Sequence, residues 1–411
     1  MTMIPKIRFS ELEEEWKESI LKDFFTKVTQ KNIDKKYTAV FTNSAEQGII
    51  DQKDFFNHDV ANSDNIGGYY VVKPDDFVYN PRVSTIAPVG PINKNNLGYT
   101  GVMSPLYLVF KIDGIDKEWL CYYFKTNKWH PFMKLTGNTG ARFDRLSLSD
   151  DQFCQMPIIH PESLSEQRRI SQFFTLLDET IRLEGERLAS LKQVKAASLQ
   201  SFFPQEGEKE PRVRFKGFSG EWKKVRLGDC GFTYSGIGFP EKEQGGQSGI
   251  PFYKVSDMNN IGNEHIMISS NNYVSKKQIE ENHWNVCKSL PAIFFAKVGA
   301  AVLLDRKRLV VEPCICDNNT MMYCLDTKIW DKYFCLKCFE NIRLSALIQV
   351  GTLPSYNAST IESIEVFIPS LAEQRALSTY FTNIDEQIRL VSEKIEKMKK
   401  VKGACLEGMM V

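Results

Sequence analysis

The sequence contains no Gly-Lys dipeptide, and this absence excludes the standard phosphate-binding loop of nucleotide hydrolases. It also lacks the Asn-Pro-Pro-aromatic motif of enzymes that methylate an exocyclic amino group; the nearest match is Asn-Pro-Arg at 80–82. Its five histidines are scattered along the chain without the spacing of metal ligands. We therefore predict no catalytic residue, no cofactor and no metal site.

The sequence also lacks an excess of either charge and any long apolar run. Its 52 Lys and Arg against 51 Asp and Glu give a formal charge of +1, which argues against a protein coated in positive charge. The most apolar run, 290–304, is too short to span a bilayer and contains Lys297. The first residues lack the apolar core of a signal peptide. We expect a cytoplasmic protein without membrane contact.

The ten cysteines raise the question of metal binding, because disulfides are rare in a reducing compartment. Only Cys314-x-Cys316 followed by Cys335-x-x-Cys338 has a spacing that suggests zinc. Residues 328–344, however, have the period of an amphipathic helix, and a free cysteine behaves as a small buried apolar residue. The pattern favours burial over a metal site.

An internal repeat dominates the sequence. The segment SLSEQRRISQFFTLLDE at 163–179 recurs as SLAEQRALSTYFTNIDE at 370–386, an offset of 207 (370 − 163). A second pair, PKIRFSELEEEWKESIL at 5–21 and PRVRFKGFSGEWKKVRL at 211–227, stands at the start of each copy. We call these pairs the closing and the opening segments. The body between them shows no clear counterpart in the other copy.

Both closing segments predict the start of a long helix. Ser163-x-x-Glu166 and Ser370-x-x-Glu373 each have the form of a capping box. The first helix is predicted over 165–203, a rod of roughly 55 Å at about 1.5 Å per residue. Apolar residues then recur at spacings of three and four, as along a coiled-coil seam. The predicted seam residues are Leu177, Ile181, Leu188 and Leu191 in the first helix, and Ile384, Ile388, Val391, Ile395 and Met398 in the second.

The bodies mix strand-like runs with turns. The runs 66–82, 101–112, 250–258 and 291–304 are rich in Val, Ile, Phe and Tyr and are bounded by turn residues. Short helices are predicted at 118–125 and 328–344. The pattern indicates an α+β fold for each body.

The repeated segments resemble those of the specificity subunit of type I restriction-modification enzymes. The resemblance is carried by SLSEQRR and SLAEQRA, each after a hydrophobic-Pro stretch, and by RFKGFSGEWKKVRLGD at 214 and IPFYKVSDMNN at 250. It covers essentially the whole chain. The first copy departs from the pattern, because its opening segment lacks the Gly-Phe and Leu-Gly-Asp steps of the second.

The resemblance implies two target-recognition domains separated by two long conserved helices, which form an antiparallel coiled coil with a pseudo-twofold internal repeat. The domains would be 1–162 and 211–369, with the helices in 163–210 and 370–411. Each domain would bind one half of a split target in double-stranded DNA. The helices would dock two methyltransferase subunits, and translocating restriction subunits would join the complex.

DNA contact would come from local cations, because the net charge is close to zero. Two glycine-containing loops, at 136–143 and 351–359, lie just ahead of the closing segments and add further candidates. The predicted DNA-binding residues are Lys73, Arg82, Lys94 and Arg142 in the first body, and Lys276, Lys277, Arg306, Lys307, Arg308, Tyr356 and Asn357 in the second.

Two other functions stay open at this stage. The helices would equally serve a structural adaptor that binds protein partners and reads no DNA. A DNA methyltransferase is the other alternative, since YSGIGF at 234–239 has the form of a glycine-rich cofactor loop. Sequence-selective, salt-dependent binding to duplex DNA distinguishes a DNA reader from an adaptor, because phosphate contacts release counterions.

Overall fold

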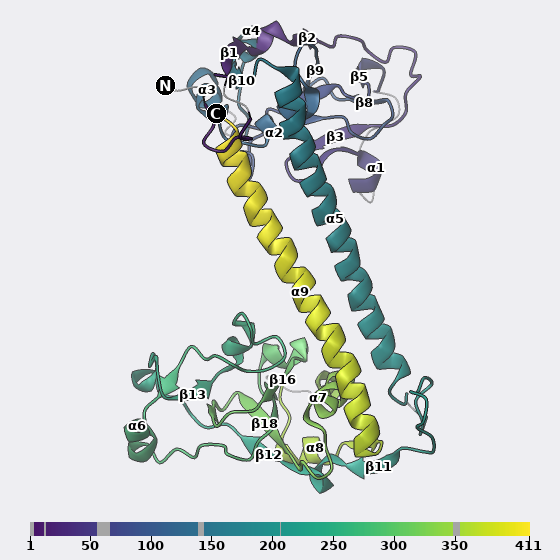
Figure 1. Ribbon diagram of the computed structural model, residues 1–411, viewed down its shortest axis with the longest axis vertical. Coiled ribbons are helices and arrows are strands. Elements are labelled where there is room, and N and C mark those ends of the chain that lie inside the picture. Colours follow the sequence, from purple (N-terminus) through teal and green to yellow (C-terminus); the bar gives the residue numbers. More distant parts are fainter. Residues whose placement is uncertain (1–3, 12–13, 56–65, 139–143, 206, 348–353) are drawn as a thin grey trace. The chain divides into compact units, whose positions relative to one another are not determined.

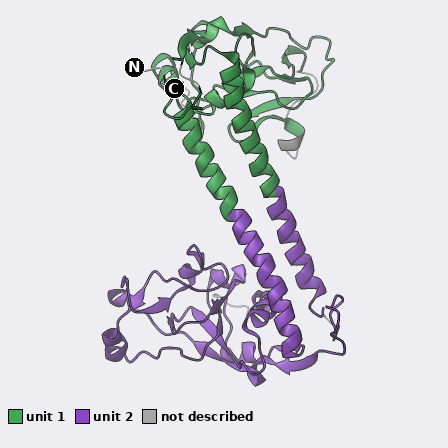
Figure 2. Ribbon diagram, in the orientation of Figure 1, with its two compact units in different colours: residues 1–185, 393–411 green, residues 186–392 purple. Residues whose placement is uncertain are grey.

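The computed structural model describes residues 4–11, 14–55, 66–138, 144–205, 207–347 and 354–411. The chain forms two compact units (Figure 2): unit 1 comprises residues 1–185 and 393–411, and unit 2 comprises 186–392. Two long helices, α5 (Leu164–Ser201) and α9 (Leu371–Met409), each give one half to either unit. Figure 1 labels many of the elements.

The body of unit 1 is built on a four-stranded antiparallel sheet in the order β2-β9-β6-β7. Smaller strand pairs, β3-β4 and β5-β8, accompany it. The strands are β1 (Lys17–Ile20), β2 (Phe25–Lys27), β3 (Phe41–Ser44), β4 (Gly48–Asp51), β5 (Tyr70–Val72), β6 (Phe77–Tyr79), β7 (Ile92–Lys94), β8 (Gly101–Met103), β9 (Leu108–Ile112) and β10 (Pro157–His160). The helices are α1 (Gln52–Phe55), α2 (Lys117–Phe124), α3 (His130–Thr136) and α4 (Asp150–Cys154).

The body of unit 2 is built on a four-stranded antiparallel sheet in the order β12-β18-β15-β16, beside a three-stranded sheet β14-β13-β17. The strands are β11 (Lys223–Arg226), β12 (Gly231–Ser235), β13 (Ile250–Tyr253), β14 (Tyr273–Val274), β15 (Ala292–Ala296), β16 (Lys307–Val310), β17 (Ile315–Cys316), β18 (Thr320–Leu325) and β19 (Glu365–Ile368). The helices are α6 (Lys276–Glu281), α7 (Lys332–Asn341) and α8 (Ala358–Glu362).

The two bodies share a topology that their sequences do not reveal. In chain order, β2, β6, β7 and β9 correspond to β12, β15, β16 and β18, and both sheets place these strands in the same order. One difference lies outside the main sheets: β5 pairs with β8 antiparallel, whereas β13 pairs with β17 parallel. The repeat therefore extends through the bodies as a fold, although not as a sequence.

A short antiparallel strand pair closes each body. The opening segment supplies one strand and the residues before the closing segment supply the other: β1 pairs with β10, and β11 pairs with β19. Trp16 and Trp222, from the two opening segments, are buried beneath these pairs in the cores of their units. The long helix that begins in the closing segment, α5 or α9, is the closing helix of its unit. We call the opening segment, this strand pair and the closing helix the frame of each unit.

Within each unit, α5 and α9 lie side by side and run in opposite directions (Figure 1). The observed helix α5 begins and ends within two residues of the prediction. Of the predicted seam residues, Ile384, Val391 and Ile395 are buried. The others are partly buried: Leu177, Ile181, Leu188, Leu191, Ile388 and Met398.

The remaining sequence predictions have mixed outcomes. The short helices predicted at 118–125 and 328–344 are α2 and α7, and the second is shorter than predicted. The run 291–304 is a strand only over β15; its end forms a 3-10 helix, Ala300–Leu304. Cys335 and Cys338 lie on α7, buried in the core. Among the described residues, no group of three or more His, Cys, Asp or Glu side chains is placed to hold a metal ion.

Candidate nucleic-acid interface

An arginine–glutamate pair joins the opening segment of each unit to its closing helix. Arg8 donates to both carboxylate oxygens of Glu166, each over 2.9 Å, and Arg214 does the same to Glu373 over 2.7 Å. Such two-point pairing fixes orientation as well as distance. In a capping box, each glutamate would instead accept a bond from the backbone N–H of the serine at its own helix N-cap. That part of the prediction is wrong, because both carboxylates bind an arginine of the opening segment.

The next residue of each closing segment is a glutamine that fixes the start of a second helix. The backbone N–H of Asp116 donates to Gln167 Oε1 over 2.7 Å, and that of Asp331 donates to Gln374 Oε1 over 2.9 Å. Asp116 and Asp331 are the N-caps of α2 and α7. The Glu-Gln dipeptide therefore positions the body of each unit on the long helices.

Ion pairs between the two long helices also repeat. Lys195 Nζ lies 2.8 Å from Asp385 in unit 2, and Lys402 pairs with Asp178 in unit 1. Each residue of the second pair lies 207 positions from one of the first (402 − 195 and 385 − 178). The helix pairing thus follows the same internal symmetry as the sequence.

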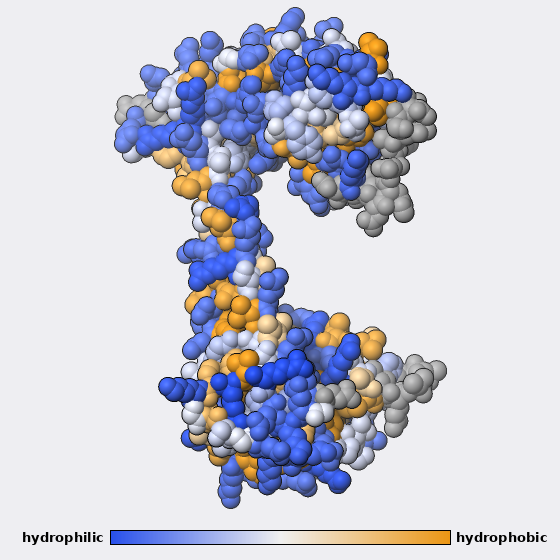
Figure 3. Space-filling model, turned by 90° about the vertical axis from the view of Figure 1, so that its right-hand side faces the viewer, coloured by the Kyte–Doolittle hydropathy of each residue, from blue (hydrophilic) through white to orange (hydrophobic). Residues whose placement is uncertain are grey.

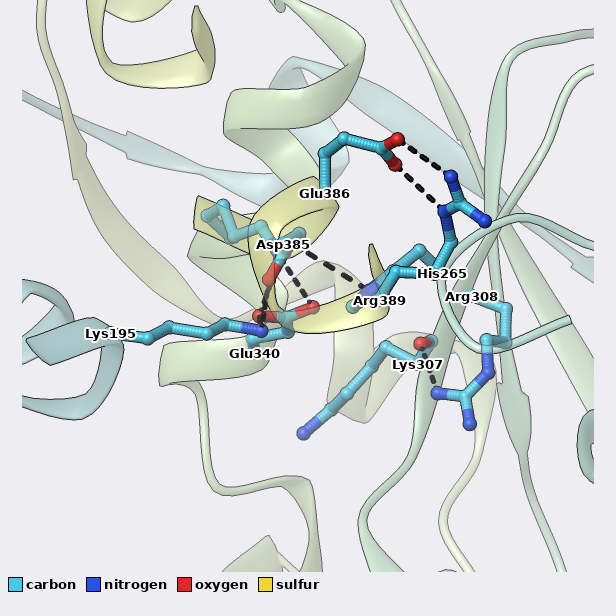
Figure 4. A network of polar contacts seen from close by, with 9 residues as sticks. Lys195, His265, Lys307, Arg308, Glu340, Asp385, Glu386 and Arg389 are labelled. Carbon is cyan, nitrogen blue, oxygen red and sulfur yellow. Dashed lines mark hydrogen bonds and ion pairs between the residues drawn. The ribbon is translucent and has the colours of Figure 1, made fainter. Parts of the chain in front are cut away.

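In unit 2 the carboxylate of Asp385 is the centre of a larger polar network (Figure 4). Lys337 on α7 donates to it over 2.7 Å, and His265 from the body lies 3.8 Å away. Glu340 also lies within 3.5 Å of Lys195. Burial by itself disfavours the charge on Asp385, but Lys337, His265 and Lys195 outweigh it and hold the pKa of this carboxyl below its usual value.

Four of the predicted DNA-binding cations are exposed and available to a phosphate. In unit 1 these are Lys73 and Arg82, and Arg82 lies 3.9 Å from Asp144 at the surface. In unit 2 they are Lys276 and Lys277, which lie in the first turn of α6. Surface ion pairs of this kind are weak, so Arg82 can exchange its partner for DNA.

Three of the predicted residues do not fit the role, because they are buried and already bonded. Lys94 donates to Asp75 over 2.8 Å and to Glu118. Lys307 donates to Asp305 and to the carbonyl of Ile342, each over 2.8 Å. The buried hydroxyl of Tyr356 donates to the carbonyl of Ala296.

The pKa shifts of these groups agree with internal roles. Burial opposes the charge on Lys94, but its bonds to Asp75 and Glu118 prevail and raise the pKa of this ammonium. Burial lowers the pKa of Lys307, and Asp305 offsets this only in part. Burial raises the pKa of Tyr356. All three side chains are bonded to groups of their own body.

The remaining predicted residues are half-buried, are exposed but bonded, or lie outside the described residues. Arg306 is half-buried and donates to Asn259, and Arg308 is half-buried with Nη1 donating to the carbonyl of Lys307 over 2.9 Å. Asn357 is exposed and caps α8, accepting from Thr360 N over 2.9 Å. Arg142 lies outside the described residues.

Sequence reasoning missed an exposed cluster of lysines in unit 1. Lys31, Lys35 and Lys36 stand close together in the loop that follows β2, and all three are exposed. Three lysines in six residues are visible in the sequence as a local basic run. This run is not among the predicted DNA-binding residues, although the aromatic Tyr37 directly follows it.

Comparisons with known proteins agree with this architecture. A family model described as type I restriction modification DNA specificity domain matches twice, at residues 13–193 and 219–400. The specificity subunit of the type I restriction enzyme MjaIX from Methanocaldococcus jannaschii is 22% identical over 315 residues, covering 72% of this chain and 68% of the relative.

Solved structures show the same fold. The S subunit of a type I restriction-modification system from M. genitalium aligns with a TM-score of 0.60 at 12% identity, over 100% of this chain and 99% of that one. A chain from a structure of type I R-M complex assembly and conformational transition aligns with a TM-score of 0.55 at 14% identity, over 95% and 96%. No helix among the described residues is both long and apolar enough to cross a membrane.

Proposed function

We propose that this chain, which belongs to the family of type I restriction modification DNA specificity domains, selects the DNA sequence on which a restriction-modification complex acts by reading two separate half-sites. The observation that carries this proposal is the contrast between frame and body. The frames repeat their residues and contacts, whereas the bodies share a topology and differ in sequence. A constant frame that holds two bodies of different sequence suits a target whose two half-sites differ.

Each part of the chain would have its own role. Residues 1–162 and 211–369 would be the two target-recognition domains, while 163–210 and 370–411 would supply the paired helices. Each body would enter the major groove, where the four base pairs can all be distinguished. Lys73 and Arg82 in unit 1, with Lys276 and Lys277 in unit 2, would contact phosphates and fix the register.

The helices would also dock protein partners, as two methyltransferase subunits with translocating restriction subunits added to them. Exposed apolar residues at repeat-related positions support two equivalent docking surfaces. Leu183 and Leu390 are each 50% exposed, and Val194 and Val401 are 48% and 45% exposed. Both pairs differ by 207 positions (390 − 183 and 401 − 194). Hydrophobic side chains interrupt the hydrophilic surface along the helices in Figure 3.

In this proposal the chain itself carries out no reaction and binds no cofactor. The methyltransferase subunits would supply the chemistry and the restriction subunits the translocation and cleavage. The chain's contribution would be affinity and the choice of site.

The test is to co-express the chain with the methyltransferase subunit of its own system and map modified bases across the host genome. We expect a split motif with a fixed gap. We also expect duplex binding by the purified complex to weaken with salt, and to favour the mapped motif over a scrambled duplex. An adaptor without DNA readout would give neither the motif nor the preference.

A further inference from the structure

A loop of unit 1, residues 30–37, is built around the fully buried asparagine Asn32. The side chain of Asn32 donates to the carbonyl of Tyr37 over 2.8 Å and accepts from the N–H of Tyr37 over 3.1 Å. Its backbone N–H donates to Tyr69 and its carbonyl accepts from Lys35. These bonds close the loop on itself and tie it to the body. The loop is therefore a fixed projection rather than a flexible link.

The fixed loop exposes an apolar side chain among cations. Ile33, next to the buried asparagine, is 81% exposed. Lys31, Lys35 and Lys36 are exposed around it, against one acidic residue, Asp34. Lys35 has a φ of +51°, a left-handed conformation that residues with a side chain adopt at some cost. The residue with the unfavourable backbone conformation therefore lies two positions from the exposed isoleucine, in the same braced loop.

A single surface isoleucine would need no explanation by itself. Unit 2, however, contains a similarly braced loop at a different place in its fold, after β13 rather than after β12, the counterpart of β2. Asn263 is fully buried and braces its loop, donating to the carbonyls of Asp257 and Ser269 over 2.8 and 2.7 Å. Ile261, two residues earlier, is 96% exposed. Arg306 donates to Asn259 at the start of this loop. Both bodies therefore present an isoleucine on an asparagine-braced loop beside at least one cation.

We propose that Ile33 is a specificity contact of unit 1, which packs against the 5-methyl group of a thymine in the major groove while Lys31, Lys35 and Lys36 bind flanking phosphates. This inference rests on the proposed function and names the chemical group that is read. The charge of the loop suits a polyanion, and the thymine methyl is the one apolar group that a base edge offers in that groove. A rigid loop presents the isoleucine without a cost in ordering on binding.

The experiment removes one partner of the contact at a time, either the thymine methyl group or the side chain of Ile33. The complex with its methyltransferase subunits is titrated with duplexes carrying the mapped target, in which each thymine is replaced singly by deoxyuridine. For the native chain, one replacement within one half-site weakens binding roughly fourfold, as expected for one buried methyl group. I33A weakens binding to the unmodified duplex to a similar extent. For I33A, replacing that same thymine by deoxyuridine causes no further loss of affinity. I33V retains most of the sensitivity.

Two controls separate the Ile33 contact from other contributions to DNA binding. I261A, which alters an equally exposed isoleucine of unit 2, leaves the deoxyuridine sensitivity assigned to Ile33 unchanged. K35Q combined with K36Q weakens binding to all duplexes and makes the dependence of log K on log salt shallower by about 0.9 per lysine.

The outcomes are distinct. If I33A keeps the native sensitivity at every thymine, or if the native complex responds to no replacement, the contact does not exist. If the two lysine substitutions leave the salt dependence unchanged, the loop does not lie against DNA. If the native complex shows no preference for its mapped target over a scrambled duplex, the proposed function itself fails, independently of Ile33.

Discussion

Single residues in the closing segments explain why the sequence repeats there. Glu166 and Glu373 each accept two bonds from an arginine about 158 positions earlier, and the adjacent glutamines bind the N-caps of α2 and α7. A shorter acid or an amide in place of either glutamate would lose one bond of the pair. The repeat is therefore strongest where a side chain must satisfy two partners at once.

The first prediction tests this at Glu373, whose side chain is 3% exposed. E373Q replaces one of two accepting oxygens by a donor that faces the Arg214 guanidinium, so we expect unit 2 to lose about 1–3 kcal/mol of unfolding free energy. Chemical denaturation measures the change. E386Q alters a surface pair with Arg389 on the same helix and should leave the midpoint unchanged. Equal midpoints for E373Q and the native chain would show that the pair is not a structural brace.

The sequence predicted the frame residues better than the binding residues, and the reason is physical. Glu166 and Trp16 lie in repeated segments, where the second copy shows that the residue type is required. Lys94 and Lys307 lie in bodies without such a comparison, and a buried lysine that pairs with acids of its own body has the same letter as one that binds phosphate. Three-dimensional burial decides between the two roles, and neither spacing nor composition encodes it.

At the scale of elements, Asp385 shows how a long helix holds a body. It lies on α9 and pairs with Lys195 on α5, with Lys337 on α7 and with His265 in the body. Because the carboxylate is largely buried, its removal or protonation would leave Lys195 and Lys337 with only Glu340 as a counter-charge among the described residues. The network therefore couples the attachment of α7 and the body to the ionisation of one residue.

The second prediction concerns this ionisation. The pKa of Asp385 is depressed in the folded state, so its stabilisation is complete above the ordinary value of 3.8 and is lost as the pH falls through the lower folded value. D385N should cost about 3 kcal/mol near neutral pH and should lose less stability than the native chain on acidification. Unfolding followed between pH 7 and pH 3 tests both. D178N, at the more exposed counterpart, should cost less; an equal cost would contradict the role of burial.

The third prediction tests the helix seam. I388D together with I395D places two carboxylates where Ile395 is buried and Ile388 partly buried between the helices. Since an unpaired charge is disfavoured there, we expect weaker assembly with the methyltransferase subunits or a changed gap between half-sites. Co-purification and mapping of modified bases measure these effects. Q387D adds one carboxylate at an exposed position of α9 and should change neither. Unchanged assembly and gap in the double variant would count against a seam that sets the spacing.

At the scale of the whole molecule, the structure extends the repeat beyond the sequence signal. Both main sheets have the same strand order although no alignment of the bodies is visible, because a sheet core accepts many apolar sequences with the right alternation. The pairing of β5 with β8 and of β13 with β17, by contrast, differs in direction. A common fold with a locally altered pairing allows each body to change its readout while remaining compatible with one frame.

The fourth prediction follows from that compatibility. Exchanging residues 23–150 for the same region of a relative should change one half of the modified motif and preserve the gap. The exchange keeps β1, β10 and α5 in place, and it moves both members of the Lys27–Asp150 pair together. The frame contacts of Arg8 and Glu166 stay native, so the new body joins an intact frame. The matched exchange of 229–357 should change the other half alone. If either exchange alters both halves or neither, base choice does not belong to the individual bodies.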